Sequence, residues 1–169
     1  PVVTTIQSSA YEPHIAYFRS YRRRWVDRWT GRWGTQKFIA VSQFAKESAS
    51  RRLGFRKEDI TVIYNTVDPE EFSPSLDKQV LRRQFGFAEG EILLICVGKL
   101  NPPKGQDTLI KALPRIIPDF PRLKLLLLGE GPSRPEWERL GSSLHLENHL
   151  AFLGRRNDVR ELLTISDLF

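Results

Sequence analysis

The segment ILLICVGKLNPPKG, residues 92–105, constrains the fold of this chain more than any other. An apolar run ends at Gly98, a short basic loop follows, and a helical pattern of apolar residues starts near Gly105. This order is typical of a buried strand that leads through a loop to a helix N-terminus. Free backbone N–H groups and the helix dipole favour an anion at such a place, and Lys99 and Lys104 add two positive charges. We therefore predict a phosphate-binding corner, with a helix beginning at Lys104 or Gly105.

Apolar, strand-like runs alternate with helical patterns along the rest of the chain. The predicted strands are Val2–Ile6, Phe38–Val41, Thr61–Tyr64, Ile92–Val97, Leu123–Leu128 and Leu150–Leu153. The predicted helices are His14–Trp33, one that begins after the N-cap Ser42, Leu76–Phe85, Gly105–Ile117, Ser133–His145 and Asn157–Ile165. Gly86 is predicted to close the third of these helices, and Ser133 with Glu136 to open the fifth as a capping box. One face of the fourth is predicted to be buried and consists of Leu109, Ile110, Leu113, Ile116 and Ile117. This alternation predicts an α/β protein with parallel sheets covered on both faces. The Pro-, Asp- and Asn-rich stretch Asn65–Pro74 is predicted to be a linker between residues 1–68 and 69–169.

Three loops are predicted to converge at one edge of the second sheet. They are Val97–Lys104, Gly129–Pro132 and Gly154–Asn157, and each follows a predicted strand. Ligands of parallel sheets bind at the carboxyl ends of the strands, so these loops are candidate ligand contacts. Two alternatives stay open: the lysines serve only solubility, and the glycines serve only tight turns rather than close approach of a ligand to the backbone. The first loop lacks the Gly-Lys-Ser/Thr spacing of a Walker loop.

Composition limits the partners and the compartment. The net charge of +6 favours anionic partners such as nucleotides, nucleic acid or a membrane surface. The single cysteine, Cys96, lies in an apolar strand and has no partner for an internal disulfide, which fits a cytoplasmic location and a buried role. The apolar runs are too short to span a bilayer, and the N-terminus has no signal-peptide pattern. Since the chain contains no methionine and both ends interrupt predicted elements, we expect an interior piece of a longer protein.

Several segments resemble the retaining glycosyltransferases of family four. They are GKLNPPKG, LLLLGEGP, HLENHLAFLGRRNDV and LLTISDLF, with FIAVSQFAKESASRRLG and ITVIYNTVDPEEF upstream. Each motif alone is weakly specific, whereas the motifs together, in the family's order and spacing, are specific. The likeness covers essentially the whole chain, most securely Lys37–Phe169.

The resemblance implies a GT-B fold, in which two Rossmann-like domains bind the acceptor and a nucleotide-sugar. Residues 1–68 would form the C-terminal part of the acceptor-side domain, and residues 69–169 the first part of the donor-binding domain. The implied reaction transfers a sugar from a nucleoside-diphosphate sugar to a glycan or lipid-linked acceptor with retention of configuration, as in polysaccharide biosynthesis. The resemblance implies neither a metal nor a cofactor, and no nucleic-acid partner.

The resemblance also assigns donor-binding roles in the three loops. Lys99 and Lys104 correspond to the basic pair that holds the donor diphosphate, and the loop containing Arg155 runs beside the nucleotide base. Arg155 has an alternative reading as a solvated surface arginine. The complete predicted donor-binding set is Gly98, Lys99, Lys104, Gly105, Gly129, Glu130, Gly154 and Arg155.

The chain departs from the family pattern at several positions. Lys99 stands where arginine is usual, which keeps the charge and loses the bidentate fork. Gln7 stands where a histidine is frequent, and Thr66 replaces a glycine of the linker. The family's two donor-binding glutamates would lie beyond Phe169 and its acceptor loop before Pro1. We therefore assign no catalytic residue and expect residues 1–169 alone to be inactive.

An aromatic stripe marks the predicted helix His14–Trp33. Its members recur at spacings of three and four and are Phe18, Tyr21, Trp25, Trp29 and Trp33. One interpretation is a core-facing stripe with a basic solvent face. The other is peripheral contact with an anionic membrane at its inner face, where arginines bind head groups and tryptophans lie at the interface.

Two further classes of function stay open as alternatives. One is a nucleotide-sugar epimerase of the same fold, and the other is a non-catalytic nucleic-acid-binding module that uses the basic helix. A metal site is not predicted: His145 and His149 are four residues apart, but a turn is expected between them and no third ligand is evident.

Overall fold

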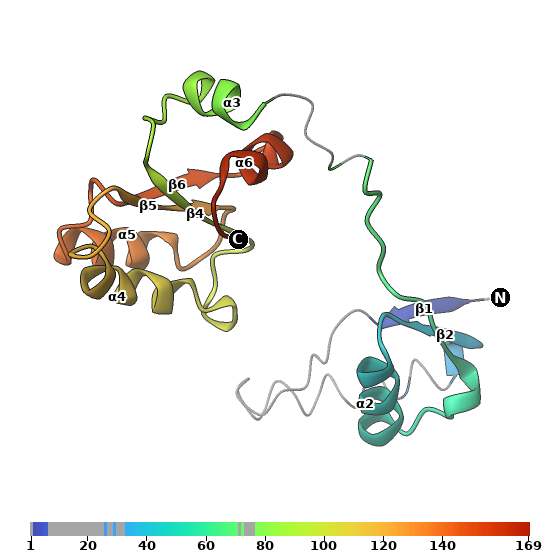
Figure 1. Cartoon of the computed structure of the whole chain (residues 1–169). Helices are drawn as coiled ribbons and strands as arrows, with labels where there is room; N and C mark the ends of the chain where they lie inside the picture. Colours follow the sequence, from blue (N-terminus) through green and yellow to red (C-terminus); the bar gives the residue numbers. More distant parts are fainter. Residues whose placement is uncertain (1, 7–25, 27–28, 30–32, 71, 73–76) are drawn as a thin grey trace. The chain divides into compact units, whose positions relative to one another are not determined.

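The chain forms two compact units, residues 1–68 and 69–169, and each is described here by itself (Figure 1). The structure is a computed structural model that describes residues 2–6, 26, 29, 33–70, 72 and 77–169. Both units contain a three-stranded parallel sheet. The prediction of an α/β protein with parallel sheets is therefore confirmed.

The first unit has the sheet order β1-β2-β3, formed by Val3–Ile6, Lys37–Ala40 and Ile60–Val62. Each predicted strand of this unit is present, with bounds shifted by one or two residues. Helix α2, Gln43–Leu53, follows β2 and begins at the predicted N-cap, where the Ser42 hydroxyl accepts a hydrogen bond from the Ala45 N–H at 3.0 Å. A short 3-10 turn η1, Lys57–Asp59, leads into β3.

The core of the first unit lies between α2 and the sheet. Small residues on α2 let the helix approach the strands closely, and a stacked ring pair, Phe38 and Phe55, closes the core with centroids 4.2 Å apart. The buried members are Phe38, Ala40, Ala45, Ala49 and Ile60.

The predicted helix His14–Trp33 falls mostly outside the described residues, and so does the prediction about Gln7. The described residues Val26, Trp29 and Trp33 are helical. Trp29 and Trp33 are 65% and 81% exposed, so core packing does not hold for these two members of the aromatic stripe. Among the described residues no helix is both long enough and apolar enough to cross a membrane.

The second unit has the sheet order β4-β5-β6, formed by Ile92–Val97, Leu123–Leu128 and Leu150–Gly154. The first two strands have the predicted bounds, because each is an apolar run that turn residues delimit on both sides. The helices of this unit are α3 Lys78–Gln84, α4 Gln106–Ile116, α5 Arg134–Ser143 and α6 Val159–Ile165, with a 3-10 turn η2 at Pro102–Lys104.

Helices cover both faces of the second sheet (Figure 1). Residues that α4 and α5 contribute, such as Ile110, Leu113 and Trp137, pack on one face with Leu125 and Leu127. Residues from α3 and α6 pack on the other face against side chains of β4 and β5. The buried residues of this second cluster are Leu81, Leu93, Ile95, Leu126, Leu128, Leu162 and Ile165. The continuous apolar sequence of β5 follows from this arrangement, since both of its faces are buried.

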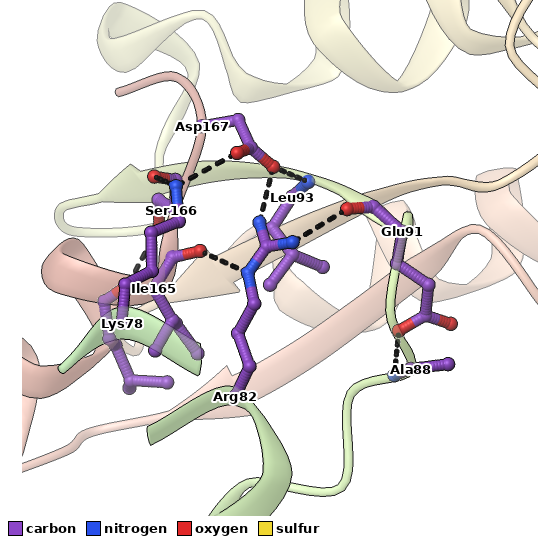
Figure 2. A network of polar contacts seen from close by, with 9 residues as sticks. Lys78, Arg82, Ala88, Glu91, Leu93, Ile165, Ser166 and Asp167 are labelled. Atoms are coloured by element: carbon purple, nitrogen blue, oxygen red, sulfur yellow. Dashed lines mark hydrogen bonds and ion pairs between the residues drawn. The ribbon is translucent and has the colours of Figure 1, made fainter. Parts of the chain in front are cut away.

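A buried arginine joins α3 to the segment that follows α6 (Figure 2). The Arg82 guanidinium donates to the Ile165 and Glu91 carbonyl oxygens, both at 3.0 Å, and to Asp167 Oδ2 at 2.5 Å. The backbone beyond α6 also pairs with β4, since the Asp167 N–H donates to the Leu93 carbonyl at 2.9 Å. The network therefore fixes this segment against the first strand of the sheet.

Asp167 is the acceptor at the centre of that network (Figure 2). Lys78 Nζ donates to its Oδ1 and the Leu93 N–H to its Oδ2, both at 2.9 Å. Burial alone would raise the pKa of this carboxyl, but the hydrogen bonds from Lys78, the Leu93 N–H and Arg82 outweigh burial and hold the pKa below its ordinary value. Asp167 is therefore a carboxylate at neutral pH.

Candidate functional site

The three predicted loops lie side by side at the carboxyl ends of β4, β5 and β6. The Leu100 N–H donates to the Glu130 carbonyl at 3.1 Å, which joins the first loop to the second. The Gly129 N–H donates to the Gly154 carbonyl at 2.7 Å, which joins the second loop to the third. The predicted convergence of these loops at one edge is confirmed, because parallel neighbouring strands bring their carboxyl ends together.

The glycines of these loops allow close backbone packing. A Cβ atom at Gly129, whose φ is +126°, would lie 2.1 Å from the Gly98 carbonyl oxygen. A Cβ atom at Gly131 would lie 2.1 Å from the Leu100 carbonyl oxygen. The glycines of the second loop therefore let its backbone pack directly against the first loop.

The two lysines of the predicted phosphate corner are exposed, and neither makes an ion pair with a described residue. Lys99 lies two residues after the end of β4, and Lys104 is the last residue of η2. The prediction that a helix begins at Lys104 or Gly105 is wrong, because α4 begins at Gln106. Gly105 adopts φ +73° between the 3-10 turn and the helix, and this left-handed residue separates the two elements.

Cys96 lies near the carboxyl end of β4 and is partly buried. The Cys96 thiol is partly buried against the core on the α4 side, and burial raises its pKa, while the positive charge of Lys104 acts in the opposite direction. The thiol stays protonated at neutral pH, which fits the predicted packing role.

Glu130 is held by an arginine that the sequence reading did not single out. Arg134 Nη1 donates to Glu130 Oε1 at 2.6 Å, and its Nε donates to Glu138 Oε1 at 2.7 Å. The same Glu130 oxygen would lie 2.8 Å from a Cβ at Gly154, so this glycine leaves room for the carboxylate. The spacing of four residues on either side of Arg134 was a usable signal for these pairs.

The remaining candidates differ in their surroundings. Arg155 is exposed and makes no ion pair with a described residue, whereas its neighbour Arg156 pairs with Asp158. His149 Nδ1 lies 2.7 Å from the Leu123 carbonyl oxygen, and His145 lies in a turn with φ +55°. Within the described part of the chain, no three His, Cys, Asp or Glu side chains are grouped as a metal site requires.

Polar groups beneath this edge complete the site. The Ser133 N–H donates to the Leu100 carbonyl at 3.2 Å, and Gln106 Nε2 donates to the Lys99 carbonyl at 3.2 Å. The loop that carries both lysines is thus bonded to the second loop and to the first residue of α4. The site combines a rigid backbone with exposed positive charge, which suits a phosphate-bearing ligand.

Comparison with known proteins places the chain among glycosyltransferases. The sequence pattern of the family described as Glycosyl transferases group 1 matches residues 77–169, and that of Glycosyltransferase Family 4 matches residues 1–71. The chain is 32% identical over 111 residues to N-acetyl-alpha-D-glucosaminyl L-malate synthase of Bacillus anthracis, which is 66% of this chain and 29% of that protein. It is 31% identical over 137 residues to one of the proteins that make up human phosphatidylinositol N-acetylglucosaminyltransferase, which is 80% of this chain and 26% of that protein.

Solved structures that resemble this chain are also glycosyltransferases or bind nucleotide-sugars. The chain is similar to HepE from Anabaena in complex with UDP-glucose, with a TM-score of 0.81, 27% identity, and coverage of 99% of this chain and 46% of that one. The complex of HepE with UDP and glucose gives a TM-score of 0.82. These likenesses confirm the predicted fold class, in which the two parallel sheets belong to two Rossmann-like domains of GT-B type. The chain spans between about a quarter and about a third of the curated relatives it matches. With the pattern of Glycosyl transferases group 1 covering more than half of its residues, the chain belongs to that family of glycosyltransferases.

Proposed function

We propose that this chain is part of an enzyme that transfers a sugar from a nucleoside-diphosphate sugar to a glycan or lipid-linked acceptor, with retention of configuration. Membership of the family supports the transfer of a sugar. The HepE complexes, which hold UDP and UDP-glucose, support a nucleotide-sugar donor. A lipid-linked acceptor gains support from relatives whose names refer to phosphatidylinositol.

In this proposal the second unit holds the donor diphosphate. Lys99 and Lys104 contact its oxygens, and N–H groups at the start of α4 face the same charge. As the bond between the sugar and the phosphate breaks, negative charge grows on the leaving diphosphate. Fixed positive charge at that place stabilises the transition state more than the ground state. The proposal requires neither a metal nor a cofactor from the residues of this chain.

One observation carries the proposal: two exposed lysines, without ion-pair partners among the described residues, stand on a loop whose backbone is bonded to its neighbours. Surface lysines elsewhere in the same unit pair with carboxylates, as Lys111 does with Asp107 and Lys124 with Glu91. Lys99 and Lys104 therefore keep their charge available for an anion from solution.

The other predicted members of the donor site have supporting places in this proposal. Gly129 lets its loop approach the backbone of the first loop, and Gly154 leaves room for the Glu130 carboxylate. Gly98 and Gly105 lie in the loop that carries the two lysines, and Gly105 adopts a left-handed φ of +73° there. Glu130, fixed by Arg134, and Arg155 at the third loop lie toward the nucleotide side. Peripheral membrane contact through residues 14–33 and a cytoplasmic location stay predictions, and the exposed Trp29 and Trp33 are compatible with the former.

The test is calorimetric titration of a nucleoside diphosphate, UDP, into the chain and its Lys104→Ala variant. Loss of one charged hydrogen bond should weaken binding by about 1.5–3 kcal/mol. Lys111→Ala is the matched control, because Lys111 lies on α4 and its charge is already paired with Asp107. Equal affinity of the Lys104 variant and the control, with both folded, would remove Lys104 from the diphosphate site.

A further inference from the structure

Gln106 is a buried side chain whose hydrogen bonding does not serve the core. It is the first residue of α4 and only 1% exposed. Its amide nitrogen Nε2 donates to the Lys99 carbonyl at 3.2 Å, while its oxygen Oε1 is buried and accepts no hydrogen bond from the described residues. A leucine would fill a similar volume and leave no side-chain acceptor unsatisfied, while the Lys99 carbonyl would lose this donor. The buried amide oxygen carries a desolvation cost that no hydrogen bond from the described residues offsets, and the bond to Lys99 is what the side chain provides.

That bond closes the loop that carries the two lysines. It joins the backbone two residues after β4 to the start of α4, across a separation of seven residues. Inside the closed segment, the Lys104 N–H donates to the Asn101 carbonyl at 3.0 Å and the Gly105 N–H to the Pro102 carbonyl at 3.1 Å. The ends and the middle of the loop are thus both fixed, although the lysine side chains are exposed.

Gln106 holds one side of the peptide group that follows Lys99, and the second loop holds the other. Leu100, the next residue, is fully buried and bonded through both of its backbone groups to the second loop and Ser133. The Lys99 carbonyl points the opposite way, toward Gln106, whose Nε2 also lies 3.7 Å from a Cβ position at Gly98. The peptide plane between Lys99 and Leu100 is therefore oriented from both sides.

We propose that Gln106 is a positioning residue for the donor phosphate, which acts by fixing the backbone of Lys99 so that its ammonium reaches the same anion as Lys104. The role rests on the proposed function, since the anion is the diphosphate of the donor. Gln106 does not touch the diphosphate in this scheme. Without the bond, Lys99 keeps its charge but its backbone is no longer held in place. Binding must then order the loop, and this cost weakens the affinity for the diphosphate.

The experiment compares UDP binding and thermal stability of Gln106→Leu with the unmodified chain. We expect the dissociation constant to rise about 3- to 10-fold, the range for one net hydrogen bond, while the unfolding midpoint stays equal or rises. Thr108→Ala is the matched control, because Thr108 is an exposed, uncharged residue of the same helical turn. Unchanged affinity of the Gln106 variant would overturn the proposal, and so would a fall in the midpoint large enough to account for the lost binding.

A double-mutant cycle tests whether Gln106 acts through Lys99. Lys99→Ala should raise the dissociation constant for UDP in the unmodified chain. In the Gln106→Leu background, the same substitution should raise it by at most half as large a factor. Equal fold-changes in the two backgrounds would show that Gln106 acts on something else and would overturn the proposal. If the unmodified chain binds no UDP, the proposed function fails together with this role. If UDP binds and Lys104→Ala weakens it while the cycle is additive, the positioning role alone fails.

Discussion

Replacing Asp167 by asparagine should destabilise the second unit far more than a comparable change at the surface. Asparagine keeps the shape of the side chain and removes the charge that faces Arg82. The Arg82 side chain is only 7% exposed and would keep its bonds to the Ile165 and Glu91 carbonyls. A buried guanidinium would then lack its only ionised partner among the described residues.

The magnitude follows from the geometry of the pair. Removal of one partner of a buried ion pair costs about 3–5 kcal/mol, because the other charge stays buried and uncompensated. Two observations reduce that figure here: Asp167 is 35% exposed, so water reaches the site, and two carbonyl oxygens still accept from Arg82. We therefore expect Asp167→Asn to lower the free energy of unfolding of the second unit by about 2–3 kcal/mol.

Amide hydrogen exchange in β5, followed by NMR, measures this free energy for the second unit alone. The matched control is Asp158→Asn, which breaks the ion pair with Arg156. The Arg156 side chain is 39% exposed and that of Asp158 is 32% exposed. For such a pair the loss should be about 0–1 kcal/mol. If Asp167→Asn costs no more than the control, the network does not hold a buried charge and the reasoning is refuted.

Three further predictions concern single groups. Because the pKa of Asp167 is lower in the folded chain, its contribution to stability is fully present above its unfolded pKa of about 4 and is lost as pH falls through the folded value; acid titration should destabilise the unmodified chain more steeply than Asp167→Asn. Gly131→Ala should destabilise by about 1–3 kcal/mol in thermal unfolding, since its Cβ would collide with the Leu100 carbonyl. Cys96 should react slowly with iodoacetamide at pH 8 and quickly once urea unfolds the chain, because burial raises its pKa; rapid reaction of the folded chain would contradict this.

The sequence was sufficient for the elements whose signals are local. Strands β4 and β5 were predicted with their observed bounds, since each is an apolar run between turn residues. The Ser42 cap was also predicted, because an N-cap depends only on the residue and its near neighbours. The same logic predicted Gly86 beyond the end of α3, where it adopts φ +76°.

Local reasoning failed where a tertiary contact replaced the local one. The predicted capping box at Ser133 is wrong: the residue precedes α5, but its side chain caps nothing, and its N–H donates to the Leu100 carbonyl of the first loop. Leu109 was predicted on the buried face of α4 and is exposed, whereas Ile110 and Leu113 are buried as predicted. The helical period gives the stripe, but the neighbouring elements decide how wide a stripe is covered.

In the candidate site, too, the residues with local signals were predicted and those with long-range partners were not. The predicted positions of Lys99, Lys104 and Glu130 follow from the rule that loops of a parallel sheet meet at the carboxyl ends of its strands. The groups that fix them have partners that spacing does not reveal: Gln106 bonds to a backbone carbonyl across a loop, and Arg82 meets Asp167 across 85 positions of the chain.

The long-range partners of Gln106 and Arg82 escape sequence-based prediction for a physical reason. A side chain that bonds to a backbone carbonyl needs no particular residue at the other end, so the sequence carries no paired signal for it. The sequence does show polar residues at positions where burial is unfavourable. Gln106 lies at a buried position of α4, and Arg82 is a charged residue on a helix that packs against the sheet. A polar residue on a predicted apolar face therefore indicates that a tertiary partner exists, although the sequence does not identify that partner.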